Sequence, residues 1–346
     1  PTLSRLVEKK DFSLKVNNRI INEIKKYNQE NDAYKVLTDE MLTGKDEDSL
    51  ALTFAISGED ITVTQVGNEI FADIRFQANV LVINMSPNPN NRKIVTSYPL
   101  RVQHRAVVKS IAELEKKKEK IFKSMLLGDG EDNVFDAVSI WGTKLKKIKL
   151  RDKDIFLAIR PMTMSNETIE TAGYSVEEQK NISYRASNLF QSIISDVADI
   201  PILPNNLDSA LAKVTVSFSS TDQLDFKTPP PDFTFDLQAT KLITKKSEKK
   251  QAGVTAFINV YGAAFVAVYK EDDEELFSLK LKSVKSFDYL ASTADEWKFS
   301  DKEQFAKLLT NFCGEFASAF VPVNEKWFAK ARRESEPKDI KSIAML

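Results

Sequence analysis

The sequence contains one cysteine, Cys313, and one histidine, His104, among its 346 residues. A single thiol excludes an internal disulfide and any metal site built from several thiolates. A single imidazole excludes every zinc site that needs two histidines. The redox compartment stays open, because cytosolic proteins and many bacterial envelope proteins can both do without disulfides.

Glycine is also scarce, with 10 residues against a usual share of about 7%. Neither G-x-G-x-x-G nor G-x-x-x-x-G-K-[ST] occurs, so the chain offers no candidate loop for a dinucleotide or a triphosphate. The 49 basic and 50 acidic residues leave a net charge of −1, whereas proteins that bind nucleic acid usually carry a basic excess. The sequence therefore predicts no cofactor and no nucleic-acid partner.

Long hydrophobic runs are missing as well. The longest apolar stretch, residues 254–269, is interrupted by Thr255 and Asn259 and falls short of the roughly 20 residues of a membrane helix. The start of the chain lacks the apolar segment of a signal peptide. Because the first residue is Pro1, either an initiator methionine or a longer leader has been removed, and both remain open. We expect a soluble chain without a transmembrane segment.

The remaining composition, 42% apolar and 29% charged, is that of a folded chain long enough for two domains. Apolar spacing predicts helices at residues 17–43 (two short ones), 107–127, 134–145, 175–198 and 301–320. Strand patterns occupy residues 50–66 (interrupted at 58–60), 70–85, 94–103, 155–162, 213–218, 233–239, 254–269 and 276–282. The predicted fold class is α+β, with two tandem related domains, each a mixed, mainly antiparallel sheet with helices packed on one face.

An internal repeat underlies the tandem arrangement. Residues 52–56, 70–82 and 94–100 match residues 233–237, 254–266 and 276–282 in order and length, and a helix follows each set. Two unrelated meanders can also look alike, but the matched lengths and turns favour duplication. We predict a first domain at 1–147, the shorter copy, a second at 148–328 with the order β-α-β-β-β-β-α, and a charged tail at 329–346.

The element order of residues 150–325 resembles that of the amino-terminal domain of TolB and the periplasmic domain of the curli-secretion lipoprotein. In both, a long helix between strands precedes a meander and a closing helix. The resemblance rests on element order and includes no diagnostic motif, so no functional residue is transferred. It implies a periplasmic protein of the bacterial envelope that binds other proteins or self-associates.

Several residues carry candidate chemistry. His104 at a strand end suits either a general base or ligand, or a surface or structural residue. Cys313, on the apolar face of the last helix, suits either a reactive thiol or a small buried hydrophobe. Residues 128–133 resemble a calcium loop, but Val134 stands where such a loop needs glycine, so a turn between helices is favoured.

Charge runs and tryptophans complete the candidates. Residues 271–275 are all acidic and suit a solvated hairpin tip or a site for a cation or basic partner. The lysine runs at 116–118, 245–246 and 249–250 suit solvated faces. Trp141, Trp297 and Trp327 accompany helices, which indicates packing.

The leading hypothesis is a non-enzymatic envelope protein that binds or assembles with other proteins. The alternatives are a hydrolase that uses carboxylates brought together from distant positions, and a cytoplasmic scaffold. We assign no catalytic, cofactor-binding or metal-ligating residue. The sequence leaves the partner, the oligomeric state and the activity open.

Overall fold

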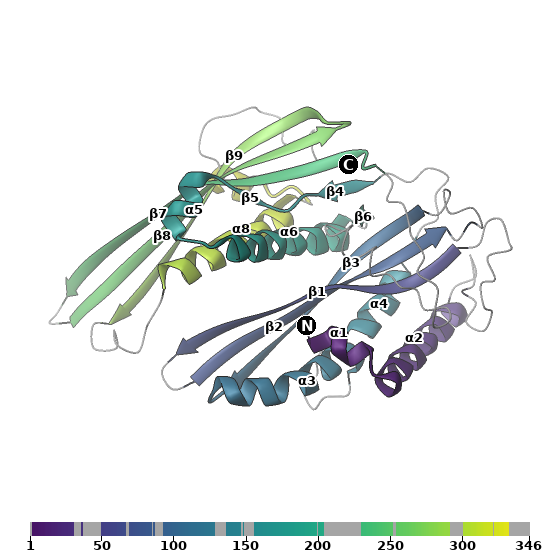
Figure 1. Cartoon of the computed structure of the whole chain (residues 1–346). Coiled ribbons are helices and arrows are strands. Elements are labelled where there is room, and N and C mark those ends of the chain that lie inside the picture. Colours follow the sequence, from purple (N-terminus) through teal and green to yellow (C-terminus); the bar gives the residue numbers. More distant parts are fainter. Residues whose placement is uncertain are drawn as a thin grey trace. The chain divides into compact units, whose positions relative to one another are not determined.

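The structure, a computed structural model, describes residues 2–30, 36, 50–66, 69–84, 86, 93–128, 136–146, 148, 156–198, 200–203, 230–251, 254–290, 300–320 and 322–331. These residues form two compact units (Figure 1). The described part of unit 1 lies within residues 2–148, and that of unit 2 within residues 156–203 and 230–331.

Unit 1 contains a three-stranded antiparallel sheet in the order β1-β2-β3. Its strands are β1 (Leu50–Val66), β2 (Glu69–Asn84) and β3 (Lys93–Val108). Its helices are α1 (Thr2–Val7), α2 (Lys10–Glu30), α3 (Ile111–Leu127) and α4 (Ala137–Leu145). The inward residues of β2 alternate strictly, from Ile70 to Val82, and bury against these helices in one apolar core.

Unit 2 has a mixed sheet in the order β6-β4-β7-β8-β9, with β5 also paired to β7. Its strands are β4 (Leu157–Ile159), β5 (Thr163–Met164), β6 (Ile202–Leu203), β7 (Phe233–Gln251), β8 (Val254–Glu271) and β9 (Glu274–Leu290). Its helices are α5 (Asn166–Ala172), α6 (Val176–Ala198), α8 (Asp301–Phe320) and α9 (Glu325–Ala331). β4 pairs parallel with β6 and β7, while β7, β8 and β9 form an antiparallel meander. The α+β fold class with two sheets is therefore confirmed.

Aromatic packing holds α6 and α8 against one face of the unit 2 meander (Figure 1). The ring of Phe312 in α8 stacks on Phe265 of β8, with centroids 3.6 Å apart. Phe190 of α6 packs on Phe235 of β7 at 4.9 Å. The predicted capping box at the start of α6 is present: the Ser175 amide donates to the Glu178 carboxylate at 2.8 Å, and the Glu178 amide to the Ser175 hydroxyl at 3.3 Å.

The two meanders share their irregularities. In β1 the register skips Ser57, and in β7 it skips Thr240; each is the eighth residue of its strand. The register also skips the third residue of β3, Val95, and the third residue of β9, Leu276. Both bulges lie on the outer strands of each meander. Measured along the middle strand, β2 or β8, the positions opposite the two bulges are five residues apart in both units. Aligning the bulges defines a residue-by-residue correspondence, which we call the bulge register.

The bulge register differs from the correspondence expected from sequence. It makes Ile74 of β2 equivalent to Tyr261 of β8, three residues away from the predicted match, and both side chains belong to their unit's core. Each set of strands forms a three-stranded antiparallel meander, but the bulges coincide at an offset that the sequence match did not give. A bulge adds a residue to one strand and shifts the phase of its apolar alternation, and the sequence match made no allowance for that shift.

Several predicted boundaries also moved. α2 begins at Lys10 and not at residue 17, and α4 begins at Ala137 behind the cap residue Asp136. The predicted start of α4 at 134 lies outside the described residues, as does the predicted strand 213–218. β1 continues through the expected break at 58–60, because the bulge turns Glu59 inward, where its carboxylate accepts the amides of Thr2 and Leu3 at 2.6 and 2.7 Å.

Candidate protein-binding surface

His104 and Cys313, the two candidate catalytic side chains, both occupy inward positions of their units. His104 is half-buried on the inward face of β3, opposite Ile74, and not at a strand end as predicted. Cys313 is fully buried in the unit 2 core, and burial raises the pKa of its thiol. A thiol in that environment behaves as a small hydrophobe.

The acidic residues 271–275 form a hairpin tip, as predicted. Asp272 and Asp273 have φ angles of 45° and 67°, and they connect β8 to β9. Gly128 closes α3 in the left-handed conformation, while residues 129–135 and Trp297 lie outside the described part. Trp141 is buried in unit 1, and Trp327 stacks on Phe316 in unit 2 at 5.8 Å, which confirms packing roles for both.

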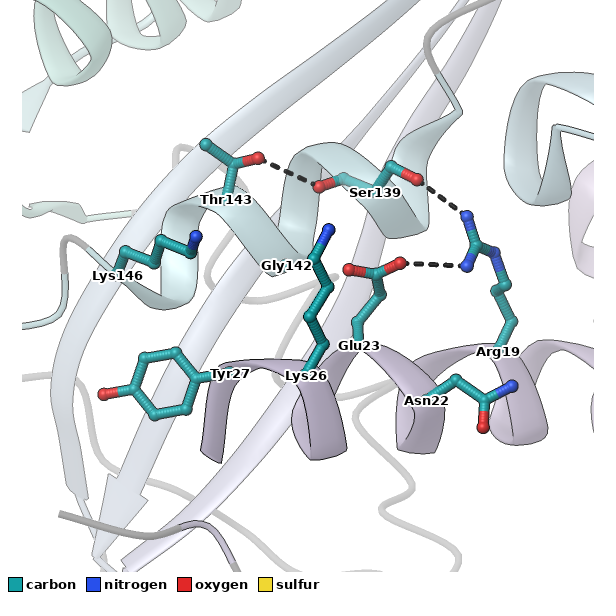
Figure 2. Close-up of a pocket in the computed structure, with 9 residues that line it drawn as sticks. All are labelled: Arg19, Asn22, Glu23, Lys26, Tyr27, Ser139, Gly142, Thr143 and Lys146. Atoms are coloured by element: carbon teal, nitrogen blue, oxygen red, sulfur yellow. Dashed lines mark hydrogen bonds and ion pairs between the residues drawn. The ribbon is translucent and has the colours of Figure 1, made fainter. Parts of the chain in front are cut away.

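A groove of about 430 Å³ lies between α2 and α4 (Figure 2). Arg19 spans it, donating to the Glu23 carboxylate and to the Ser139 hydroxyl, each at 2.9 Å. Gly142 lets the helices approach, since a Cβ there would lie 2.7 Å from Oε2 of Glu23. Among the described residues that line this groove, Glu23 is the only carboxylate, whereas glycoside hydrolysis uses a pair.

The described residues contain no cluster of three or more His, Cys, Asp or Glu able to hold a metal ion. Within the same part of the chain, no helix combines the length and apolarity needed to cross a membrane. Each sheet also carries a distinct set of side chains on the face turned away from the helices of its unit.

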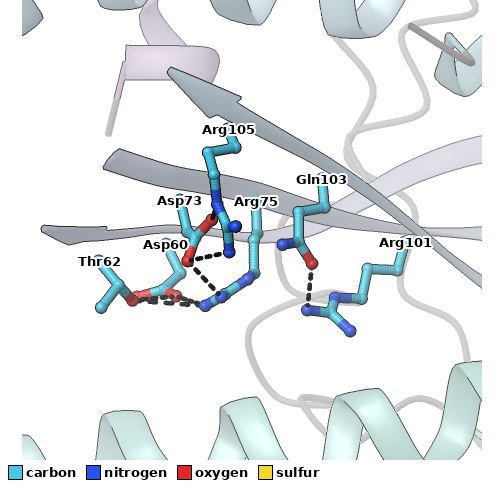
Figure 3. A network of polar contacts seen from close by, with 7 residues as sticks. All are labelled: Asp60, Thr62, Asp73, Arg75, Arg101, Gln103 and Arg105. Carbon is cyan, nitrogen blue, oxygen red and sulfur yellow. Dashed lines mark hydrogen bonds and ion pairs between the residues drawn. The ribbon is translucent and has the colours of Figure 1, made fainter. Parts of the chain in front are cut away.

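In unit 1 the outward face of the meander carries a network of ion pairs and hydrogen bonds (Figure 3). Arg75 lies between two carboxylates, 3.3 Å from Asp60 and 3.5 Å from Asp73. Arg105 reaches the same Asp73 at 2.8 Å, and Arg101 donates to Gln103 at 3.0 Å. Two of these contacts join neighbouring strands between register partners: Asp60 with Arg75 across β1 and β2, and Asp73 with Arg105 across β2 and β3.

In unit 2 the corresponding face is apolar and basic. Across β7, β8 and β9, the register places three outward rows side by side, and we call these nine residues the lysine-framed face: Lys241–Ala264–Lys282, Ile243–Gly262–Val284 and Lys245–Val260–Ser286. The central row contains two exposed apolar side chains, Ile243 at 56% and Val284 at 60%. Ile243 leans across the glycine between them, because a Cβ on Gly262 would lie 2.8 Å from its Cγ1.

The bulge register makes these two faces equivalent position by position. All seven residues of Figure 3 occupy positions that correspond to the lysine-framed face. The row Asp60–Arg75–Gln103 corresponds to Ile243–Gly262–Val284. The outward face of the unit 1 meander thus carries ion pairs between its own side chains. The outward face of the unit 2 meander exposes apolar side chains beside lysines.

Sequence reasoning missed the lysine-framed face because β7 was predicted to end at residue 239. The bulge at Thr240 breaks the alternation there, so the lysine-rich residues 241–251 no longer resemble the same strand. One signal was present: residues 254–269 are apolar at both alternating sets of positions. An antiparallel strand of that kind needs cover on both faces.

No family model matches the sequence, and no curated protein matches it. Three solved structures are similar in part. A homologue of a neuraminyllactose-binding hemagglutinin from Helicobacter pylori has 8% identity and a TM-score of 0.26, covering 53% of this chain and 96% of its own. A minor lipoprotein from Acinetobacter baumannii has 4% identity and a TM-score of 0.22, covering 51% and 95%. The hypothetical protein CT253 from Chlamydia trachomatis has 9% identity and a TM-score of 0.19, covering 51% and 93%. At these TM-scores the similarities carry no argument about what this chain does.

Proposed function

We propose that the chain is a non-enzymatic binding protein of the bacterial envelope that engages another protein through the lysine-framed face. The observation that carries the proposal is the exposure of Ile243 and Val284 at the centre of that face, at 56% and 60%. Apolar patches rimmed by polar side chains are typical of protein interaction sites. Lys241 and Lys282 at the two ends of one neighbouring row, and Lys245 and Ser286 at the ends of the other, supply that rim.

Unit 1 provides an internal comparison that supports this proposal. It carries Asp60, Arg75 and Gln103 at the positions of Ile243, Gly262 and Val284, within a meander that has the same bulges. Polar side chains at these positions are therefore compatible with the frame. Because folding does not demand the apolar row, we attribute it to binding.

The envelope location is supported by the element order of unit 2. There, a parallel strand pair bridged by helices precedes the meander and the closing helix α8. This is the order by which the sequence resembles the TolB and curli-secretion domains. Fractionation of the source cells tests the location: a periplasmic pool is expected, and an exclusively cytoplasmic pool would favour the scaffold alternative.

We further infer that the chain arose by tandem duplication with one domain per unit, close to the predicted bounds of 1–147, 148–328 and 329–346, except that Ile148 packs in the core of unit 1 and Ala331 in that of unit 2. The coinciding bulges support this inference, because bulges are retained within families. If the meanders are copies, residues should be exchangeable between equivalent positions. That expectation gives the sharpest test of the binding surface.

The test variant transfers the central row of unit 1 to unit 2 as Ile243→Asp, Gly262→Arg and Val284→Gln, which we call the graft variant. It should fold, since Asp60 and Arg75 pair at 3.3 Å across the same register in unit 1. The matched control is Val107→Thr on β3, which alters a 49% exposed β-branched residue elsewhere. Circular dichroism and thermal unfolding establish that all three proteins are folded.

Proteins retained from an extract of the source cells by immobilised wild type, graft variant and control are then quantified by mass spectrometry. At least one protein should be retained by the wild type and the control and lost by the graft variant. Identical retention by all three folded proteins would rule out the lysine-framed face as the binding surface. Turnover in a broad hydrolase screen would contradict the non-enzymatic role.

A further inference from the structure

Building on the proposed binding role, we infer that the partner presents an acidic amphipathic helix that lies along β8. Its apolar side covers the middle strand, and its carboxylates flank the lysines of β7 and β9. This goes beyond a general binding surface, because it specifies the partner's secondary structure, its charge and its direction on the sheet.

Charge complementarity supports the acidic character. Lys241 and Lys245 project from β7, Lys280 and Lys282 project from β9, and all four side chains are exposed. The nine residues of the lysine-framed face include no acidic side chain. Lys241 also contacts Glu167 at 3.1 Å, but both side chains stay about half exposed, at 50% and 58%, so this pair is weak. A partner with carboxylates on two sides would neutralise the lysines of β7 and those of β9.

The spacing of the lysine rows fits a helix. Neighbouring strands lie about 4.8 Å apart, so β7 and β9, on either side of β8, are separated by about 10 Å. An α-helix with its side chains is about 10–12 Å wide. A helix centred on β8 would therefore place the residues of its two flanks directly above the lysines of β7 and those of β9.

The middle strand provides a smooth apolar track for that helix. The outward residues of β8 run Val260, Gly262, Ala264, Val266 and Val268, which are all small or β-branched. None of them projects far enough to form a pocket for a single side chain. Such a track suits the continuous apolar stripe of an amphipathic helix.

The surroundings argue against two other occupants. The acidic residues 271–275 continue directly from β8 into the hairpin tip, where an anionic membrane would repel them. The track also lacks the aromatic and long apolar side chains of membrane-inserting surfaces. A second copy docked face to face would place lysine rows against lysine rows. A separate acidic helix that covers the lysine-framed face and ends before the hairpin tip avoids both conflicts.

The experiment pans a displayed library of helical peptides on the full chain. Each peptide carries a fixed leucine stripe, and its flanking positions are randomised among Glu, Lys, Gln and Ser. The wild type is compared with the double variant Lys245→Glu and Lys282→Glu, and with the matched control Lys116→Glu, an exposed lysine of α3. Sedimentation with phosphatidylglycerol vesicles and with phosphatidylcholine vesicles tests the membrane.

Wild type and control should enrich Glu-flanked peptides, and the double variant, which keeps Lys241 and Lys280 beside its two new carboxylates, should lose that preference. The double variant should bind a selected Glu-flanked peptide roughly tenfold more weakly, since two rim ion pairs are reversed. Lys-flanked enrichment, or no flank preference, on the wild type would overturn the inference. Lysine-dependent sedimentation with phosphatidylglycerol alone would assign the face to a membrane and also overturn it. In either case the proposed function would still stand if the graft variant loses its cellular partner.

Discussion

The hydroxyl of Tyr261, in the middle of β8, donates a hydrogen bond to Oδ1 of Asp301, the first residue of α8, at 2.7 Å. Oδ2 of the same carboxylate accepts from Lys246 of β7 at 2.9 Å. Burial disfavours the charged form of Asp301, but these two bonds outweigh it and hold its pKa below the ordinary value. One carboxylate thus ties both strands of the β7–β8 hairpin to the start of α8.

Replacing Tyr261 by Phe should therefore destabilise unit 2 in a pH-dependent way. At pH 7 the variant should lose about 1 kcal/mol of unfolding free energy, a value reduced for the solvent exposure of the carboxylate. Because the folded-state pKa of Asp301 is lowered, the contribution is present above its ordinary value of 3.8 and disappears as the pH falls through the folded-state pKa. Urea unfolding at several pH values measures this.

The control for this prediction is Tyr174→Phe. The hydroxyl of Tyr174 donates to the main-chain carbonyl of Lys302 at 3.1 Å, and a carbonyl does not titrate. Its cost should stay constant over the same pH range. Equal pH dependence of the two variants would contradict the role given to Asp301.

A second titration is expected at the start of α6. A hydrogen bond from Lys302, together with those from Ser175, lowers the pKa of Glu178 from 4.5 to about 2. The stabilising effect is thus complete above pH 4.5 and is lost as the pH falls toward 2. Lys302→Met should move the pKa of Glu178 upward in an NMR titration and flatten the acid limb of the melting-temperature curve. An unchanged Glu178 titration would show that Lys302 does not control it.

Two helix-ending glycines should differ in their tolerance of alanine. Gly128 and Gly173 have φ angles of 74° and 67°, so alanine costs about 1 kcal/mol at each through backbone strain alone. A Cβ at Gly128 would also lie 2.8 Å from Oδ2 of Asp136, the cap of α4, whereas nothing lies within 4 Å at Gly173. Gly128→Ala should therefore be the more destabilising variant by denaturant unfolding. Equal losses would mean that the Asp136 side chain moves aside at no cost.

The single thiol should report on the unfolding of unit 2. Cys313 is fully buried, and burial raises its pKa, so the reactive thiolate is scarce in the folded state. Alkylation of the native protein should be slow and should accelerate in step with denaturant unfolding. Rapid modification without unfolding would indicate that α8 detaches locally. Mass spectrometry of quenched samples gives the rate.

Sequence patterns located the elements that bury one clear face. The helix at 301–320 was predicted with its exact bounds, because Phe305, Phe312 and Phe316 recur at helical spacing. The capping box of α6 was found for a similar reason, since Ser175 and Glu178 are its complete signal. Patterns of this kind depend only on residues within one element.

The candidate surface could not be found in the same way. Its residues come from three strands, and their meeting depends on the bulges at Thr240 and Leu276. Thr240 is an ordinary strand residue that nothing in its neighbourhood marks as unpaired. Lys245 therefore looked like part of a solvated run, and only the register shows that it frames the apolar row.

The bulges also determine how such a sheet can evolve. Each bulge reverses the alternation of its strand, so that Ile56 and Glu59 both face inward in β1, as Ala239 and Leu242 do in β7. Losing Ser57 or Thr240 would turn every later residue of that strand to the opposite face. A deletion at a bulge would therefore expose core residues of that strand, whereas a substitution keeps the number of residues and so keeps each side chain on its face. Two meanders with the same bulges can still differ at the nine outward positions, which carry ion pairs in unit 1 and apolar and basic side chains in unit 2.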